Sequence, residues 1–246
     1  MLEALVLAGH RVVCPDLVGF GKSDKPTDQH WYTYERHVET VTRHLDQVAL
    51  DQVTVVVQDW GGAIGLRWAV EHADLVGRLV ILNTGLFTGR TSKGFMAWRD
   101  YAERTPDLPI GRLIQGATTT ELAPEVIAAY EAPFPTPESK AGAQRFPLLV
   151  PLTEEAPGVA EMSEVKEALS RWDKPALVAF SDADPVFPFP RSGEQFTALI
   201  PTAGDQVRIE GAAHFLQEDR PAEIVEAMLG AFGRPNDQAM TERASA

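Results

Sequence analysis

Short apolar runs and helically spaced apolar positions alternate along the chain. The run at Val53–Val57 is continuous, as expected for a strand buried on both faces of a sheet. Between residues 34 and 50, Val38, Val41 and Leu45 recur at helical spacing. Such alternation predicts an α/β fold with a mostly parallel, doubly wound sheet. Further strands are predicted at 11–15, 78–82, 176–180 and Val207–Ile209, and further helices at 61–76 and Pro221–Phe232.

One long segment breaks this alternation. Residues 86–171 contain helix-like pieces separated by prolines and show no convincing strand. An insertion of this kind between two core strands predicts a helical cap over the carboxyl edge of the sheet, where ligands bind in open α/β folds. The predicted organisation is a core of residues 1–85 and 172–234, a cap of residues 86–171, and a flexible tail of residues 235–246.

Composition narrows the possible partners and the compartment. The formal net charge of −13 argues against nucleic acid or an anionic membrane as a partner. The single cysteine, Cys14, excludes an internal disulfide and a multi-cysteine metal site, and we expect it to be a small buried hydrophobic residue. No apolar run approaches the roughly 18 residues needed to span a bilayer, and the first residues lack signal-peptide features. We therefore expect a cytoplasmic protein.

The sharpest local motif lies where the strand Val53–Val57 gives way to a helix. It reads Gln58-Asp59-Trp60-Gly61-Gly62, so a carboxylate stands on the turn and two small residues follow it. A reactive residue in this place projects into the site, and the N–H groups of the following helix face it. Aspartate also caps helix N-termini well, so an N-cap role for Asp59 is the alternative at this point.

Two further strand ends carry matching residues. Asp182 and Asp184 follow the strand at 176–180, and His214 follows the last strand. The chain order nucleophile, acid, histidine is that of α/β-hydrolases. We prefer Asp184 as the acid because its spacing to Pro188 matches the usual acid turn, and we expect Asp182 to be a turn residue capping its own loop. Three other histidines fall within helical stretches and are expected to be solvated: His37, His44 and His72.

These motifs together resemble the haloalkane dehalogenases, a family of α/β-hydrolase fold. Gln-Asp-Trp-Gly-Gly is similar to the family's nucleophile motif, and residues 16–24 look like its loop after the fourth core strand. The segment 130–150 resembles the subgroup whose acid follows the seventh core strand, and the likeness extends to about Phe232. The resemblance implies that Asp59 attacks the halogen-bearing carbon to form an alkyl ester, which His214, oriented by Asp184, hydrolyses.

The resemblance also implies halide donors and a simple set of partners. An indole N–H is a donor on an apolar body and suits a weakly hydrated halide, so Trp60 is the first expected donor. For the second we prefer Trp98 in the cap, because Trp172 lies at the return to the core and is expected to be structural. Some family members carry the cap tryptophan further on, in a region where this chain has none. The expected partners are a small apolar halogenated substrate, water and halide, without a metal or cofactor.

The start of the sequence departs from the family pattern. Relatives carry three core strands and a His-Gly-x-Pro loop before the equivalent of Leu2, so the first core strands are missing here. We expect a gap in the sheet centre or a new pairing of buried runs, and a chain that is unstable or weakly active alone. The expectation is that the chain is a fragment or has a misplaced start codon. An in-frame stop codon just before Met1, with no His-Gly-x-Pro upstream, would contradict this.

Two other functions fit parts of the sequence. An epoxide hydrolase shares the aspartate ester chemistry and needs acidic tyrosines in the cap, for which Tyr101 and Tyr130 are available. Gln58 and the cap segment favour dehalogenation over this alternative. The chain is also compatible with an inactive α/β-hydrolase-like fragment that serves as a binding or scaffold module. Halide release from 1-bromoalkanes, diol formation from styrene oxide, or neither, distinguishes the three.

Overall fold

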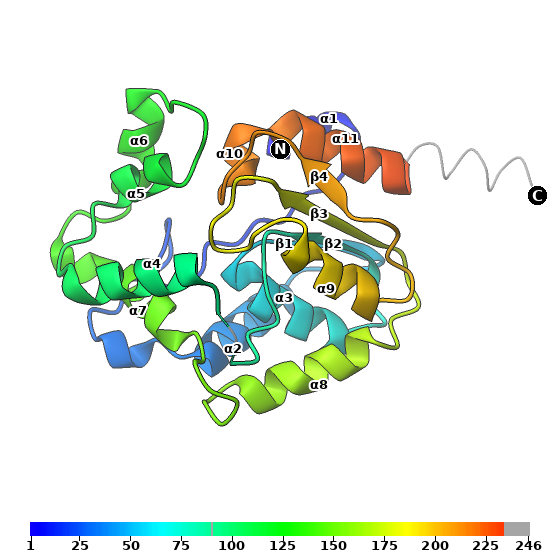
Figure 1. Cartoon of the computed structure of the whole chain (residues 1–246), viewed down its shortest axis with the longest axis horizontal. Helices are drawn as coiled ribbons and strands as arrows, with labels where there is room; N and C mark the ends of the chain where they lie inside the picture. Colours follow the sequence, from blue (N-terminus) through cyan, green and yellow to red (C-terminus); the bar gives the residue numbers. More distant parts are fainter. Residues whose placement is uncertain (90, 234–246) are drawn as a thin grey trace, which may run out of the picture.

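A parallel sheet forms the centre of the molecule. The computed structural model describes residues 1–89 and 91–233. Its four strands lie in the order β1 (Val53–Val57), β2 (Val76–Leu82), β3 (Ala176–Ser181) and β4 (Val207–Ile209), and every neighbouring pair is parallel (Figure 1). The predicted α/β class and parallel sheet are therefore confirmed.

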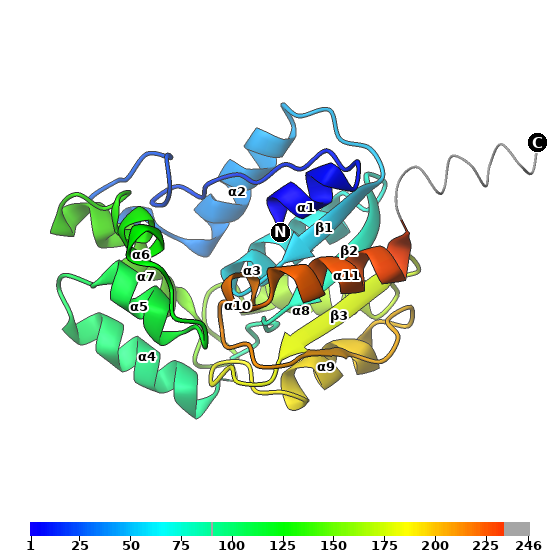
Figure 2. The same ribbon diagram turned by 90° about the horizontal axis from the view of Figure 1, so that it is seen from above.

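Helices cover both faces of this sheet. One face carries α3 (Trp60–Glu71) and α9 (Arg191–Leu199). Two further helices, α2 (Tyr34–Leu45) and α8 (Val159–Leu169), pack against α3. The other face carries α11 (Pro221–Phe232), with α1 (Leu2–Leu7) beside it and the short α10 (Leu216–Asp219) before it (Figure 2). Successive strand residues serve the two cores in turn, because side chains of a strand point alternately to opposite faces. Leu79 and Ile81 pack under α3, whereas Val80 and Leu82 pack under α11.

A group of helices stands beyond the ends of the strands (Figure 1). No strand interrupts the described part of the predicted cap range, 86–89 and 91–171. Helix α8 lies inside that range but packs on α3 and adds Met162, Val165 and Leu169 to the core. The division into core and cap therefore remains a prediction. The predicted tail, residues 235–246, lies outside the described residues. The helices beyond the strands are α4 (Lys93–Arg104), α5 (Ile110–Gly116), α6 (Pro124–Glu131) and α7 (Ala141–Leu149), with 3₁₀ turns η1 (Gln29–Trp31) and η2 (Pro137–Lys140).

The prediction of a strand at residues 11–15 is wrong. This segment has no regular structure, and Cys14 within it is exposed rather than buried. A strand needs a hydrogen-bonded neighbour, and among the described residues β1 pairs only with β2. The new pairing considered from the sequence does not form, and Val56 on β1 is 40% exposed. The predicted helices at 34–50 and 61–76 both end earlier, at Leu45 and Glu71.

The expectation that His37 is solvated is also wrong. His44 is exposed and His72 is partly buried, but His37 is only 1% exposed. Its ring stacks on Phe146 with centroids 4.6 Å apart, and neither ring nitrogen has a hydrogen-bond partner. Burial disfavours the charged imidazole and lowers the pKa of His37 to about 4. The residue therefore behaves as part of the aromatic core.

Because unfolding restores an ordinary pKa to His37, the unfolded state binds its proton first as the pH falls. The free energy of unfolding should therefore decrease by about 2–3 kcal/mol between pH 7 and pH 4.5 from this residue alone. Urea unfolding at both pH values should show that His37→Phe removes this part of the decrease. His44→Phe, at an exposed position of the same helix, is the matched control. Equal pH dependence in all three proteins would contradict the assignment.

Candidate active site

Asp59 stands on a strained turn between β1 and α3. Its φ is +47° and its ψ is −124°, a region that non-glycine residues avoid at a cost of about 1–3 kcal/mol. Hydrogen bonds to the end of β2 hold this backbone: Asp59 N–H donates to Asn83 O at 2.8 Å, and Thr84 Oγ1 donates to Asp59 O at 2.6 Å. Asp59 precedes α3, but its side chain makes no capping hydrogen bond, so the geometry does not support the N-cap alternative.

The two glycines after the turn differ in their surroundings. A Cβ atom on Gly62 would lie 1.9 Å from Thr84 Oγ1, the hydroxyl that binds the Asp59 carbonyl. No atom lies within 4 Å of a Cβ built on Gly61. The close approach of α3 to the end of β2 thus depends on Gly62, while Gly61 imposes no such limit.

The structure brings the three residues expected to react into one site. His214 Nδ1 lies 2.9 Å from Asp184 Oδ2, and His214 Nε2 lies 3.7 Å from Asp59 Oδ1. The Asp184 side chain is fully buried, and its other oxygen accepts the Val186 N–H at 2.7 Å. An ionised carboxylate accepts hydrogen bonds only, so Nδ1 carries a proton in both charge states of the ring, and Nε2 is the nitrogen that faces Asp59.

Asp182 takes no part in this arrangement. Its Oδ2 binds Arg208 at 2.8 Å, and its Oδ1 accepts the Gly211 N–H at 2.9 Å. The hydrogen bond from Arg208 lowers the pKa of Asp182. Asp182 therefore supports the neighbouring loop after β4, rather than its own loop as the sequence suggested.

Polar residues that the sequence reading did not select hold the carbonyl groups around His214. Asn83 Nδ2 and Ser181 Oγ donate to Ala213 O at 3.1 and 2.8 Å. Gln58 Nε2 donates to His214 O at 3.1 Å, although the sequence used Gln58 only as a family marker. Their position in the sequence could have indicated this role, because all three stand at the carboxyl ends of predicted strands.

The charges of Asp59 and His214 depend on each other. Burial raises the pKa of Asp59, and the positive form of His214 and the backbone N–H of Trp60 offset this only in part. Burial alone would lower the pKa of His214, but the Asp184 hydrogen bond and the negative charge of Asp59 together raise it. A change in the charge of Asp59 must therefore change the proton affinity of His214.

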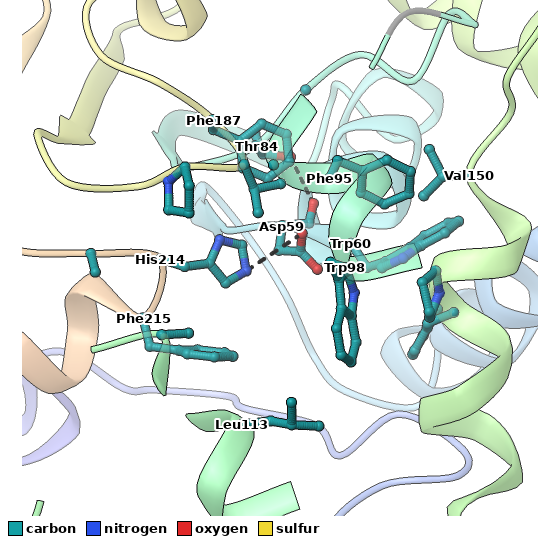
Figure 3. A pocket seen from close by; sticks show the side chains of 18 of the residues that line it. Asp59, Trp60, Thr84, Phe95, Trp98, Leu113, Val150, Phe187, His214 and Phe215 are labelled. Atoms are coloured by element: carbon teal, nitrogen blue, oxygen red, sulfur yellow. Dashed lines mark hydrogen bonds and ion pairs between the residues drawn. The ribbon is translucent and has the colours of Figure 1, made fainter. Parts of the chain in front are cut away.

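Asp59 faces a cavity of about 1710 Å³ between the strand ends and the helices beyond them. Figure 3 shows Asp59 between His214 on one side and Trp60 and Trp98 on the other. Within the described chain, neither indole N–H has a hydrogen-bond acceptor on the protein. By contrast, Trp172 packs in the core under α3 and is absent from the cavity wall. The wall also includes four apolar residues from the segment between β2 and β3: Phe87, Phe95, Leu113 and Phe134.

Comparisons with known proteins agree with this geometry. The family model for the alpha/beta hydrolase fold matches residues 1–221. Haloalkane dehalogenase 1 of Mycobacterium tuberculosis is 46% identical over 233 residues, covering 93% of this chain and 77% of that protein. The haloalkane dehalogenase of Mycobacterium marinum is 44% identical over 232 residues, with the same coverage of both chains. The chain belongs to the haloalkane dehalogenase family.

A solved haloalkane dehalogenase also shares the fold. The structure of DpaA from Paraglaciecola agarilytica superposes with a TM-score of 0.89 at 30% identity, covering 94% of this chain and 78% of that one. Family membership confirms the α/β-hydrolase fold and the resemblance first found in the motifs around Asp59. The chain is accordingly a hydrolase of the class that acts on carbon–halide bonds.

The cap tyrosines do not favour the epoxide hydrolase alternative. Tyr130 Oη donates to Glu218 Oε1 at 2.6 Å, and burial and this carboxylate raise its pKa, which makes it a poorer acid. Tyr101 is 44% exposed and does not line the cavity. Tyr130 thus lacks the lowered pKa that protonation of an epoxide oxygen would require, and Tyr101 lies outside the cavity.

Residues 1–89 and 91–233 contain no cluster of three or more His, Cys, Asp or Glu side chains placed as metal ligands. None of their helices combines the length and apolarity needed to cross a membrane.

Proposed function

We propose that the chain hydrolyses haloalkanes to alcohol and halide, with Asp59 as nucleophile, His214 as general base and Asp184 as the group that orients it. One observation carries this assignment: the Asp59 carboxylate lies in a largely apolar cavity, 3.7 Å from Nε2 of a histidine whose Nδ1 binds a buried carboxylate. The same cavity wall carries the indoles of Trp60 and Trp98.

In the first step an Asp59 oxygen attacks the carbon that bears the halogen. A carbon–oxygen bond forms, the carbon–halogen bond breaks with its electron pair, and an alkyl ester and a halide ion result. Negative charge moves from a carboxylate to the departing halide. The apolar wall excludes water, which strengthens the interaction of this charge with any donor aimed at it.

The indole N–H groups of Trp60 and Trp98 are the proposed halide donors. Trp60 is held edge-on by Phe87 and against Phe146, each with ring centroids 5.0 Å apart, so its indole needs little reorganisation. Its backbone N–H lies beside the Asp59 carboxylate and suits the oxyanion that forms when the ester is attacked. A donor set in place before reaction stabilises the transition state without a cost of reorientation.

Replacing Trp60 with phenylalanine should reduce kcat/KM for 1-bromobutane by roughly 10²–10³-fold, because one preorganised donor is lost. Trp98→Phe should act in the same direction. Trp172→Phe is the matched control, since that indole N–H is buried in the core and has no hydrogen-bond partner. Halide release followed with a halide electrode measures all three. A Trp60→Phe protein as fast as the Trp172→Phe protein would remove the proposed donor.

In the second step His214 takes a proton from a water molecule that attacks the ester carbonyl carbon. The bond between the carbonyl carbon and the oxygen that bears the alkyl group then breaks, this oxygen takes up the proton held by His214, and the alcohol leaves with the oxygen first supplied by Asp59. The regenerated carboxyl group of Asp59 loses its proton to water. Esterification neutralises Asp59, which removes one of the causes that raise the pKa of His214. The imidazole thus becomes a neutral base more readily once the ester has formed.

A labelling experiment tests this route. In ¹⁸O-water, a single turnover of 1-bromobutane should give unlabelled butanol and leave one ¹⁸O atom on Asp59, because water attacks the ester and not the substrate. Peptide mass measurement locates the label, and styrene oxide in a parallel reaction tests for diol. Labelled butanol in a single turnover would show direct attack by water and remove Asp59 as nucleophile.

A further inference from the structure

The polypeptide around His214 is held from two sides. Side chains of the strand ends bind the carbonyl groups of Ala213 and His214, as described above. The N–H groups on either side of His214 bind elsewhere: Ala213 N–H donates to Asp219 Oδ2 at 2.8 Å, and Phe215 N–H donates to Ala117 O at 3.1 Å. Ala117 directly follows α5, so the segment after α5 contributes to the position of the histidine.

Asp219 connects this segment to the histidine loop. Its carboxylate is only 7% exposed and accepts four hydrogen bonds, all from backbone N–H groups. Besides the bond from Ala213, Thr119 donates to both oxygens at 2.9 and 3.0 Å, and Thr120 donates to Oδ1 at 2.7 Å. Burial tends to raise the pKa of Asp219, but these N–H groups outweigh it and lower the pKa. The group is therefore a carboxylate matched to a set of donors.

Two further hydrogen bonds join the same two segments. Thr119 Oγ1 donates to Gly211 O at 2.6 Å, and Tyr130 Oη donates to Glu218 Oε1 at 2.6 Å. Residues 117–130 and residues 211–219 thus meet along a continuous contact that has Asp219 at its buried end. The catalytic machinery proposed above does not otherwise use any of these groups.

We propose that Asp219 is a positioning residue for the base: it ties residues 119–120 to the backbone before His214 and so holds the imidazole where it activates water. The proposal rests on the proposed function and adds a specific consequence to it. Ester formation needs Asp59 and the halide donors, whereas ester hydrolysis needs His214 in place. Loosening the Asp219 contacts should therefore slow the second step and leave the first nearly unchanged.

Asp219→Asn tests this with little change of shape. The amide keeps one acceptor oxygen and turns an NH₂ group toward N–H donors, so some of the four hydrogen bonds are lost. We expect ester hydrolysis to slow roughly 10- to 100-fold, since small displacements of a catalytic group have effects of this size. Ester formation should stay within about twofold. Rapid quenching and intact-mass measurement during reaction with 1-bromobutane should then show the alkyl ester accumulating.

Asp182→Asn is the matched control. Asp182 also accepts a backbone N–H of the histidine loop, at Gly211, but makes no hydrogen bond to residues 117–130. If the substitutions only reduce stability, ester formation and ester hydrolysis should slow together in each variant, or neither step should slow. Equal rates of ester hydrolysis in the folded Asp219→Asn and Asp182→Asn proteins would overturn the proposal.

A second variant covers the case in which Asp219→Asn does not fold. Thr119→Val keeps the β-branched shape at an exposed position and removes only the hydroxyl bond to Gly211 O. It should slow ester hydrolysis by a few-fold and leave ester formation unchanged, and an unchanged hydrolysis rate would overturn the proposal. A His214→Gln protein run beside it tests the function itself. If that protein forms no ester, the proposed function fails and this inference with it.

Discussion

Replacing His214 with glutamine should lower turnover of 1-bromobutane by roughly 10³–10⁴-fold, because the proposed general base is removed from the second step. The first step requires only Asp59 and the halide donors, so substrate should still react once. Intact-mass measurement should therefore find one butyl group per chain, and peptide mapping should place it on Asp59. A glutamine amide is able to donate to Asp184, which avoids leaving that buried carboxylate without a partner.

The matched control is His72→Gln. His72 directly follows α3, at the end of the helix opposite to Asp59. Its Nδ1 lies 2.9 Å from Trp68 O. This variant should keep full turnover and show no persistent adduct. A His214→Gln protein that binds substrate but carries no adduct would remove the assignment of both Asp59 and His214.

Asp59→Asn should abolish both steps, with a loss of turnover of more than about 10⁴-fold, because an amide is not an effective nucleophile toward an alkyl halide. Asparagine is suited to the test because it tolerates the positive φ of +47° at this turn better than most residues do. The fold should not lose stability, because burial raises the pKa of Asp59 and the neutral amide removes a buried charge, and the carboxylate accepts no capping hydrogen bond from α3. The variant should release no halide in the first turnover and gain no mass.

The double variant Asp59→Asn with His214→Gln provides the control for this second prediction. It should behave like Asp59→Asn alone, because a base that acts on the ester has no effect when no ester forms. A butyl adduct in the double variant would show that another residue is alkylated. Thermal unfolding of each protein should confirm that the compared chains are folded.

Local sequence predicted the fold class and the neighbourhood of the site well. The continuous apolar run at Val53–Val57 became β1, and the strand ends that follow in the sequence carry Asp184 and His214. Parallel strands end at one edge of a sheet, so residues placed after them meet even when about 150 positions separate them. This is why three short motifs far apart in the sequence point to side chains that lie together in the structure.

Burial was harder to predict from the same patterns. The β-branched run at residues 11–15 has strand propensity but no strand partner in the structure, so it stays irregular and Cys14 is exposed. His37 lies on a helix with a polar sequence, yet its ring is covered by Phe146 from a segment more than 100 residues away. Propensity describes what a segment prefers alone, whereas burial depends on which other segments arrive beside it.

The sequence by itself selected the candidate reactive residues: a carboxylate on a strand-to-helix turn, a histidine and acid after later strands, and an indole beside the carboxylate. Only the tertiary structure chose between Asp184 and Asp182, since both follow β3 but just one side chain turns toward His214 Nδ1. It also introduced Asp219, whose three N–H donors come from two segments about 100 positions apart. Hydrogen bonds require donor and acceptor within about 3 Å in a suitable direction, and that geometry exists only once the chain has folded.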